Sequence, residues 1–497
     1  MSKAEIPIRL EPLSIEFAAA LDAPLLSLLA EHGFEFPCGG AGTCGGCGVR
    51  VLSGSLPMSE ADEAAFSCEE LAGGWRLACQ ARAASALVLE CSQWRMDVLT
   101  ETAATPELLP AARRQGLGIA IDLGTTTIAA QLIDLASGAV IAVETGLNPQ
   151  ARHGSDVMNR IRAALDGADL TALVRAYLGQ TIAALYRGRE HSIVRIVLVG
   201  NTVMHHLFSG CSVEPLAHTP FASPQLGRQT FTPADLGWTL PASCTIEFAP
   251  CLGGFVGSDI LAGLVATGLG CGDDLTALID LGTNGEIAIG NRQRIVCAST
   301  AAGPAFEAGS IRMGMRAATG AIAHVSLRAE VLQTRVIGDA PPRGICGSGL
   351  VDAVAAGLIL GAILPSGRLA NGARYFQLAG PVVLHQSDIR ELQLAKGAIA
   401  AGFKLLLRRL HAGVNDLKAI YLAGAFGNYV DVDSALRIGL LDAPCGLIHP
   451  AGNTALHGAR LLVESAGEPR LPLIEHVSLA ADPVFQEEFA ACMTFPA

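Results

Sequence analysis

The sequence predicts two unlike parts, a small α+β domain followed by a duplicated α/β body. A loop with three cysteines in ten residues, Cys38 to Cys47, lies near the N-terminus. The pentapeptide Ile-Asp-Leu-Gly-Thr occurs twice, at 121–125 and at 279–283, and a segment with two prolines, 96–115, separates the loop from the first copy. A chain of 497 residues is too long for one core, so about two to four domains are expected.

The predicted N-terminal domain, residues 1–95, has strand patterns on both sides of the cysteine loop. Ile6–Leu10 and Leu13–Phe17 alternate as two strands, and apolar positions in 25–29 indicate a helix. Val49–Leu52 leaves the loop as a further strand. This order resembles the β-grasp fold of [2Fe–2S] ferredoxins.

The cysteine spacing itself predicts an iron–sulfur cluster. Cys38, Cys44, Cys47 and Cys79 follow the pattern C-x5-C-x2-C-x31-C, close to the plant-type C-x4-C-x2-C…C spacing of [2Fe–2S] sites. Glycine and other small residues between them let backbone N–H groups approach a cluster. Cys68 is the alternative fourth ligand. Structural zinc usually needs two C-x2-4-C pairs, and here only Cys44 and Cys47 form one.

Composition narrows the classes of function. The formal net charge of −12 and an aromatic content of 5% argue against nucleic-acid binding. No apolar run approaches the ~20 residues of a membrane span, so no membrane partner is expected. Fourteen cysteines without a recognisable signal peptide favour a cytoplasmic protein.

The repeated pentapeptide predicts two phosphate-binding hairpins. In each copy an apolar strand ends at an aspartate, Asp122 or Asp280, and a Gly-Thr turn leads into a second strand. Backbone N–H groups and hydroxyls of such turns can bind phosphate, and an aspartate at the strand end can hold hydrated Mg2+. The candidate phosphate contacts of the two turns are Thr125, Thr126, Gly282, Thr283 and Asn284.

A third element completes a nucleotide site. Leu417–Asn428 reads as a buried strand that ends in a glycine turn, and Ile196–Thr202 is an equivalent segment in the first half. The turn containing Gly424 and Gly427 resembles the adenosine-binding turn of the actin, sugar-kinase and heat-shock chaperone superfamily. No Walker A motif is present, which excludes a P-loop site.

The body is therefore expected to consist of two ribonuclease-H-like halves, 116–270 and 271–497, after a linker at 96–115. Each half should hold a mixed five-stranded sheet with helices on both faces. In the first half, Thr245–Phe248 is expected as the fifth strand and Ser258–Ala266 as the closing helix. In the second, three helices are expected, the longest of them capped by Ser387: Gly349–Leu358, Asp388–Leu410 and Ala455–Glu464.

The combination of a ferredoxin domain with this ATPase body resembles the reductive activators of corrinoid-dependent methyltransferases over essentially the whole chain. The matching segments include 148–150, 156–160, 280–286, 302–307, 388–396 and 422–427. Some members of that family carry a C-terminal cluster domain, but the final stretch here has only Cys492, so no such cluster is expected.

The resemblance implies a function: ATP-dependent transfer of one electron to an inactive Co(II) corrinoid, which restores Co(I). It implies a [2Fe–2S] cluster, ATP and Mg2+ as cofactors. It also implies a corrinoid protein or methyltransferase as partner, an upstream low-potential electron donor and, as in related bodies, a homodimer. Asp122 and Asp280 would organise Mg2+ and the attacking water, the two turns would contact phosphates, and Gly424 and Gly427 would face the adenosine.

Some assignments stay open at this stage. Glu286 follows the second turn and is a candidate metal or water ligand, although a strand glutamate often has a structural role. Ser299 lies in a small-residue loop that could approach the corrinoid, and the adjacent His205 and His206 favour structural roles. The alternative functions are an ATP-dependent activator of another low-potential dehydratase or reductase, a small-molecule kinase with a fused redox domain, and an actin-like scaffold.

Overall fold

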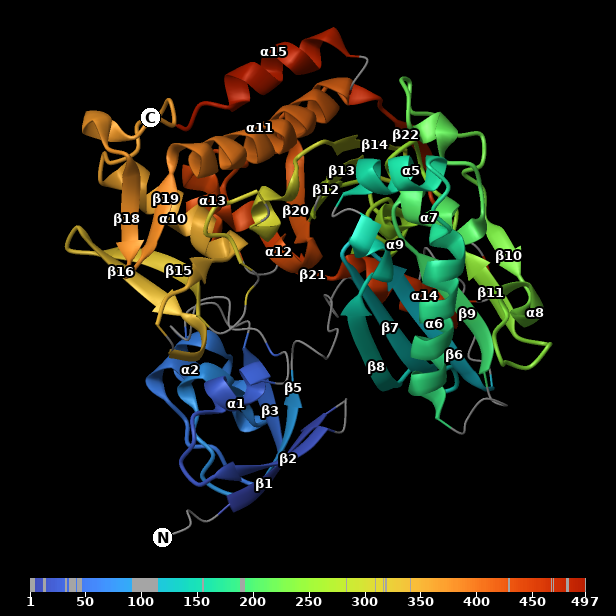
Figure 1. The fold of residues 1–497 in the computed structure, drawn as a ribbon, viewed down its shortest axis with the longest axis horizontal. Coiled ribbons are helices and arrows are strands. Elements are labelled where there is room, and N and C mark those ends of the chain that lie inside the picture. The colour runs from blue at the N-terminus through green and yellow to red at the C-terminus, as the bar shows by residue number, and fades with distance from the viewer. Residues whose placement is uncertain are drawn as a thin grey trace.

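The computed structural model of the chain contains an N-terminal domain below a body with two halves (Figure 1). It describes residues 5–11, 15–31, 34, 42, 47–91, 115–153, 156–187, 193–282, 284–308, 310–315, 317, 320–339, 341–427, 430–465, 467, 469–479 and 482–496. The predicted linker at 96–115 lies outside these residues except for Gln115.

The N-terminal domain is a five-stranded sheet in the order β2-β1-β5-β3-β4. Its edge pair β1–β2 is antiparallel, while β5 lies parallel to β1 in the middle of the sheet. Helix α1 places Leu25, Leu26 and Leu29 in the domain core. The elements are β1 (Glu5–Glu11), β2 (Ile15–Ala20), α1 (Leu25–Glu31), β3 (Gly48–Ser53), α2 (Glu60–Ala65), α3 (Cys68–Ala72), β4 (Trp75–Leu77), the 3-10 turn η1 (Ala78–Gln80) and β5 (Leu87–Cys91).

The first half of the body has a mixed sheet in the order β10-β11-β9-β6-β7-β8. The expected fifth strand, Thr245–Phe248, is present as β11, but a sixth strand, β10, pairs with its outer edge. The elements are β6 (Leu117–Leu123), β7 (Thr127–Asp134), β8 (Val140–Leu147), η2 (Pro149–His153), α5 (Val157–Leu165), α6 (Leu170–Tyr186), β9 (Ile193–Val199), α7 (Thr202–Ser209), η4 (Glu214–Leu216), β10 (Gln229–Phe231), α8 (Pro233–Leu236), β11 (Thr245–Phe248) and α9 (Ser258–Thr267).

The second half has a sheet of the same size, in the order β21-β20-β12-β13-β14-β22. The expectation of five strands per half was therefore wrong, because β10 has only three residues and the four residues of β22 are exposed or half-buried, without an alternating pattern. The sheet strands are β12 (Leu275–Leu281), β13 (Gly285–Gly290), β14 (Arg294–Thr300), β20 (Leu417–Ala423), β21 (Ile448–Gly452) and β22 (Leu473–His476).

The helices of the second half match the predicted ones, with shifted ends. The long helix begins at Gln386, and its capping residue is His385 rather than Ser387, because Asp388 reaches back to the His385 N–H at 2.8 Å. The helices and short turns are η5 (Pro304–Glu307), α10 (Gly347–Ile359), η7 (Ala370–Gly372), α11 (Gln386–Arg409), η8 (Val414–Asp416), α12 (Gly424–Gly427), α13 (Val432–Arg437), η9 (Cys445–Leu447), α14 (Thr454–Glu464) and α15 (Pro483–Cys492).

A subdomain that the sequence pattern did not indicate is inserted between β14 and α11. It consists of a three-stranded sheet and a hairpin: β15 (Ala321–Arg328), β16 (Val331–Val336), η6 (Ile337–Asp339), β17 (Gly344–Ile345), β18 (Tyr375–Ala379) and β19 (Val382–His385). Helix α1 contacts η6, and Ile337, Ala321 and Ala323 belong to the same buried cluster as the core of the N-terminal domain. The N-terminal domain thus packs directly on this subdomain (Figure 1).

Two helices cross between the halves. Helix α14 lies in sequence between β21 and β22 of the second sheet, but it packs on β6 and β9 of the first sheet and on α9. Helix α9 contacts α14 with Ala262 and Val265, and its Ile260 and Leu264 pack with Leu278 of the second sheet. The expectation that α14 belongs to the second half alone is therefore corrected. The two halves are joined through this pair of helices.

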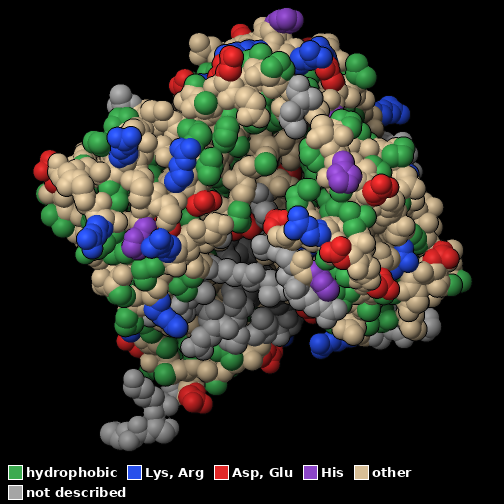
Figure 2. Space-filling view, turned by 45° about the horizontal axis from the view of Figure 1, so that its top comes forward, with side chains coloured by type: hydrophobic (Ala, Val, Ile, Leu, Met, Phe, Trp, Pro, Cys, Tyr) green, Lys and Arg blue, Asp and Glu red, His purple; other side chains and the backbone are tan. Residues whose placement is uncertain are grey.

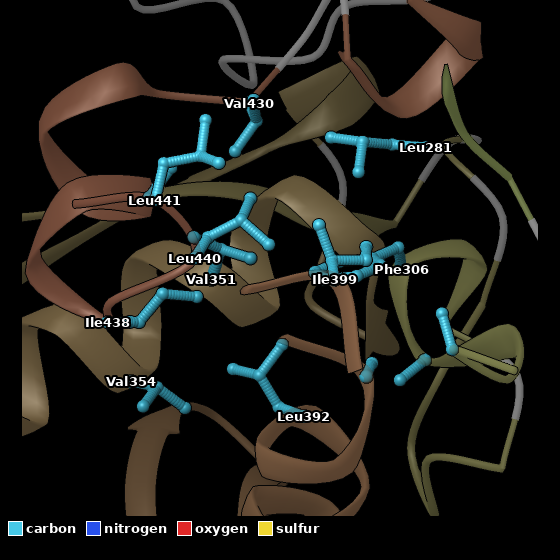
Figure 3. Packing of buried hydrophobic residues seen from close by; sticks show 14 of the residues in the cluster. Leu281, Phe306, Val351, Val354, Leu392, Ile399, Val430, Ile438, Leu440 and Leu441 are labelled. Carbon is cyan, nitrogen blue, oxygen red and sulfur yellow. The ribbon is translucent and has the colours of Figure 1, made fainter. Parts of the chain in front are cut away.

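The largest core lies in the second half, between its sheet and helices α10 and α11. Val351 and Val354 of α10 face Leu440 and Ile438, which follow α13, while Ile399 of α11 lies beside Phe306 and Leu392 of the same helix belongs to the same core (Figure 3). This core holds the strand ends that carry the second candidate site in place. Among the described residues, no helix is both long enough and apolar enough to span a membrane.

Candidate nucleotide and cluster sites

The two hairpins that carry the repeated pentapeptide have the same strand order but pair in registers that differ by one residue. In each, the aspartate is the last residue but one of its strand, so Asp122 lies opposite Ala129 and Asp280 lies opposite Glu286. Only the second hairpin therefore places a carboxylate across from the aspartate. Glu286 is buried, and the Ser299 hydroxyl donates a hydrogen bond of 3.3 Å to its Oε1.

A fourth carboxylate joins these three, and the sequence analysis did not single it out. Asp259 is at the start of α9, where Gly257 packs so closely on the Gly200 turn that a Cβ would lie 2.2 Å from the Gly200 carbonyl oxygen. Ser258 N–H also donates to that oxygen at 2.9 Å. In the sequence, the only signal for Asp259 was an acidic residue soon after a glycine at the start of a predicted helix. The position of Asp259 relative to the other carboxylates depends on the contact between Gly257 and Gly200, which the sequence does not show.

Burial raises the pKa of all four carboxylates, and a neighbouring carboxylate adds to the effect for three of them: Asp259, Asp280 and Glu286. Asp122, Asp259 and Asp280 are half-buried and Glu286 is buried, and burial is the largest cause of the raised pKa for each. Burial, followed by the charge of Asp122, raises the pKa of Asp280 to about 7, and burial with the charge of Asp280 raises the pKa of Asp259 to about 8. Burial raises the pKa of Glu286 as well, with Asp259 as the next cause.

Asp122 differs because it has a hydrogen-bond donor from the other half of the chain. Asn453 Nδ2 donates to Asp122 Oδ2 at 2.9 Å, and the Asn453 side chain also caps α14. Burial raises the pKa of Asp122 to about 6, and the Asn453 bond acts in the opposite direction. Sequence reasoning missed Asn453, which is more than 300 residues from Asp122 in the chain.

Such a group of acids repels itself unless a cation is present. The described residues contain no group of three His, Cys, Asp or Glu side chains close enough together to hold a metal ion by themselves. This arrangement fits Mg2+, which keeps several waters and usually takes only one or two carboxylates together with substrate phosphates. The donor set therefore fits a hydrated Mg2+ bound with a nucleotide.

The first phosphate turn is braced by two asparagines that the sequence analysis did not assign. Asn201 Nδ2 donates to Thr125 Oγ1 at 2.8 Å. Asn148 donates twice, from Nδ2 to the Gly124 oxygen and from its backbone N–H to the Thr126 oxygen, both at 2.9 Å. Because Thr125 and the turn backbone are held in this way, their remaining donors have a defined direction.

The second phosphate turn is closed by a backbone hydrogen bond, and Gly424 of the adenosine turn lies close to its aspartate. Gly282 N–H donates to the Asn284 oxygen at 3.1 Å, and Thr283 lies outside the described residues. Gly424 has φ of +84°, and a Cβ there would lie 2.6 Å from Asp280 Oδ1. A glycine is therefore required both by the backbone conformation and by the space beside the carboxylate.

Gly427 has a similar steric reason, since a Cβ would lie 3.0 Å from the Leu422 carbonyl carbon. The following helix, α13, begins as expected: Asp431 caps it by accepting a hydrogen bond from Ser434 N–H at 2.8 Å. The structure thus places Glu286 and Gly424 beside Asp280, with Asp122 close enough for its charge to act on Asp280. In the space-filling view the surface is hollowed between the two halves, with acidic side chains near its rim (Figure 2).

Two of the four candidate cluster ligands lie within the described residues, Cys47 and Cys79, while Cys38 and Cys44 lie outside them. Ala78 N–H donates to the Cys47 oxygen at 2.9 Å, which brings η1, and with it Cys79, next to Cys47. Gln80 Nε2 approaches Cys79 Sγ at 3.4 Å, and Gly42 has φ of +74° and packs on Gln80. Cys68 begins α3 on the exposed surface. The arrangement fits a cluster loop closed by Cys79.

The adjacent histidines have structural partners. His206 contacts the Thr202 oxygen and Ser223 Oγ, both at 2.7 Å, and His205 contacts the Gly227 oxygen at 3.2 Å. Both rings are buried, and burial lowers the pKa of each. They stabilise the core of the first half, as the sequence analysis favoured.

Comparison with known proteins covers the chain in three parts. Residues 8–84 match the 2Fe-2S iron-sulfur cluster binding domain, residues 117–271 match the RACo middle region, and residues 274–497 match the C-terminal domain of RACo, the ASKHA domain. The first match identifies a [2Fe–2S] domain, and the ASKHA class implies ATP with Mg2+ as the ligand of the cleft.

Individual relatives agree with these matches. Corrinoid activation enzyme RamQ of Eubacterium limosum is 34% identical over 438 residues, covering 80% of this chain and 73% of that protein. The [Co(II) methylated amine-specific corrinoid protein] reductase of Methanosarcina barkeri is 28% identical, covering 70% and 69%. A solved structure, the reductive activator for corrinoid,iron-sulfur protein, superposes with a TM-score of 0.66 at 26% identity, covering 99% of this chain and 98% of that one. The chain belongs to the RACo family of corrinoid-activating proteins.

Proposed function

We propose that this chain reductively activates a corrinoid protein, returning an inactive Co(II) corrinoid to Co(I) with the use of ATP. The observation that carries the proposal is the presence of a [2Fe–2S] domain and both RACo regions in one chain. The relatives named for corrinoid activation and corrinoid reduction match across most of their length, which supports the same substrate class here.

In this proposal Cys38, Cys44, Cys47 and Cys79 bind the cluster, which when bound supplies one electron for each Co(II) that is reduced. The backbone bond between Ala78 and Cys47 supports Cys79 as the fourth ligand. The exposed position of Cys68 argues against the alternative. Small residues around the loop leave the backbone N–H groups free to approach sulfur.

The cleft residues are proposed to bind MgATP. Thr125, Thr126, Gly282, Thr283 and Asn284 contact the phosphates, and Gly424 and Gly427 lie against the adenosine. Asp122 and Asp280 orient hydrated Mg2+ and the attacking water, and Glu286 supports Asp280 from the opposite strand. Asp259 is added to this group because its negative charge acts on both Asp280 and Glu286.

ATP could change the reaction only through a difference in its affinity for two conformations. Such a conformational change needs a physical connection between the nucleotide site and the rest of the body. The Asn453–Asp122 hydrogen bond supports one, because it joins the start of α14 to the first phosphate hairpin. The packing of the N-terminal domain on the β15–β17 subdomain gives a second link, since a movement of the second half would carry that domain along.

Four further properties stay predictions. An upstream low-potential donor would reduce the cluster domain, and the protein would work in the cytoplasm, where thiol ligands stay reduced. A homodimer would be detected by the mass of the protein in solution. The division into 1–95, 96–115, 116–270 and 271–497 would be tested by limited proteolysis.

The central experiment mixes the reduced protein with a Co(II) corrinoid protein of the methylated-amine type and follows the Co(I) absorbance with and without ATP. We expect Co(I) to accumulate and ATP to accelerate or extend it. An Asp280→Asn variant with an unchanged cluster spectrum should lose the ATP effect. If no corrinoid protein is reduced under any condition, the proposal fails, and phosphoryl transfer to an added sugar would instead favour a kinase.

A further inference from the structure

A second cavity lies outside the nucleotide cleft, between α11, the C-terminal end of α15 and the segment that follows α13. Its volume is about 630 Å³, within the usual size range of small-molecule sites. None of the residues that line it belongs to the two phosphate turns, the adenosine turn or the cysteine loop. Helices α11 and α15 lie side by side above the second sheet (Figure 1).

A buried ammonium group lies in this cavity. Lys396 is 1% exposed, and its Nζ donates one hydrogen bond, to the Thr494 oxygen at 2.6 Å, and lies 5.3 Å from the centre of the Phe495 ring. An ammonium has three N–H donors, so two of them lack a hydrogen-bond acceptor among the described residues. Burial lowers the pKa of Lys396 to about 8.

The residues that surround the Lys396 ammonium also line the cavity, so the Nζ atom lies at the cavity wall. Thr494, Phe495 and Gly439 are lining residues, and a Cβ at Gly439 would lie 3.3 Å from the Lys396 Nζ. Gly439 has φ of +72°, so its backbone favours glycine and keeps this space open.

The cavity carries an excess of positive charge. Lys396, Lys404 and Arg408 follow one face of α11 at helical spacing and all line the cavity, whereas Asp442 is the one acidic residue in the lining. Arg408 pairs with Glu488. Lys404 makes no hydrogen bond or ion pair with a described residue, and its charge contributes to the lowered pKa of Lys396. Two lysines are thus left without an acidic partner.

The remaining walls are apolar and include Phe403, Leu407 and Leu440. A phosphate group would be expected to use an arginine fork or a set of backbone N–H groups, and the one arginine here is already paired. We propose that this cavity is a binding site for a small organic monoanion with an apolar tail, whose carboxylate contacts Lys396 and Lys404. The site is separate from the proposed ATP and cluster sites.

The test is calorimetric titration of the full-length protein with octanoate, with octan-1-ol and acetate as probes that lack the charge and the tail. We expect saturable 1:1 binding of octanoate, with octan-1-ol and acetate at least about tenfold weaker. Equal affinity for octanoate and octan-1-ol would overturn the anionic class of ligand, and a lack of saturable octanoate binding would overturn the site.

Substitutions in the cavity lining test whether octanoate binds in this cavity. Lys404→Met is the first variant because Lys404 is half-buried and its replacement breaks no described hydrogen bond. It should weaken octanoate about five- to tenfold and leave octan-1-ol unchanged, as expected for the loss of one charged contact. Lys418→Met, at an exposed position of β20, is the matched control and should bind octanoate normally. Filling the cavity with Ala400→Phe should abolish binding of both probes. Octanoate affinity that is unchanged in Lys404→Met and Ala400→Phe would overturn the proposal.

Discussion

The two phosphate hairpins have the same pentapeptide, yet their strand registers differ by one residue and their surroundings differ as well. The first is held by neutral amides: Asn148 and Asn201 bind its turn, and Asn453 binds Asp122. The second is surrounded by acids, with Glu286 opposite Asp280 and Asp259 near both. The difference suggests an unequal division of labour, in which both turns contact the phosphates and Asp280 contributes more than Asp122 to holding the metal and water.

The largest effect is expected when the two aspartates are exchanged for asparagine one at a time. Asp280→Asn should lower ATP hydrolysis by roughly a hundredfold or more, in the range seen when a positioned acid–base or charged group is lost. Asp122→Asn should cost less, since its neighbours are amides that tolerate a neutral partner. Phosphate release measures both, and the cluster absorbance should stay unchanged in each. Equal losses would contradict the division of labour.

The adenosine turn provides the next comparison. Gly424→Ala places a methyl group against Asp280 in a left-handed conformation, which costs roughly 1–3 kcal/mol of backbone strain besides the clash. We expect nucleotide affinity to fall about tenfold or more, measured by titration with a fluorescent ATP analogue. Gly446→Ala, where a Cβ meets no atom within 4 Å, is the matched control. Similar affinities for the two variants would show that Gly424 does not approach the nucleotide site.

A smaller effect is expected at the bond between the halves. Asn453→Ser retains a capping oxygen for α14 but removes the donor to Asp122, whereas Asn453→Ala removes both and should cost about 1 kcal/mol more in folding stability. Because the Asn453 bond lowers the pKa of Asp122, Asn453→Ser should shift the acidic limb of the ATPase pH profile upward. A profile that does not move would assign Asn453 a capping role only.

The smallest effect concerns stability as a function of pH. The folded-state pKa values of Asp122, Asp280 and Asp259 are raised to about 6, 7 and 8, so protonation stabilises the folded metal-free protein, and this contribution is lost as the pH rises from about 4 through 8. The lowered pKa values of four buried or half-buried histidines act in the opposite direction below about pH 6.5, so the fall in Tm should be visible above that pH. Asp259→Asn should flatten the curve at its upper end, and Mg2+ with ATP should reverse it. A Tm that rises from about pH 6.5 to 8.5 without metal would contradict this account.

Much of the fold followed from local patterns. The strand ending at Asp280, the strand Thr245–Phe248 and the cap at Asp431 all have short-range signals, namely an apolar run, an alternation and a capping residue. The inserted strands β15–β19 and the short edge strands β10 and β22 lack such signals, because their apolar residues are few or their length is only two to eight residues. Such strands are defined by the neighbour they pair with.

The amino-acid sequence by itself determined which chemistry the chain carries: the cysteine spacing, the two Asp-Leu-Gly-Thr turns and the glycines of the third turn are local and can be read directly. Only the tertiary structure decided what surrounds each turn. Asp259 meets Asp280 because Gly257 packs on Gly200, and Asn453 meets Asp122 because α14 crosses to the other sheet. Contacts between residues that are far apart in the chain depend on how the helices and sheets pack, and no local pattern encodes them.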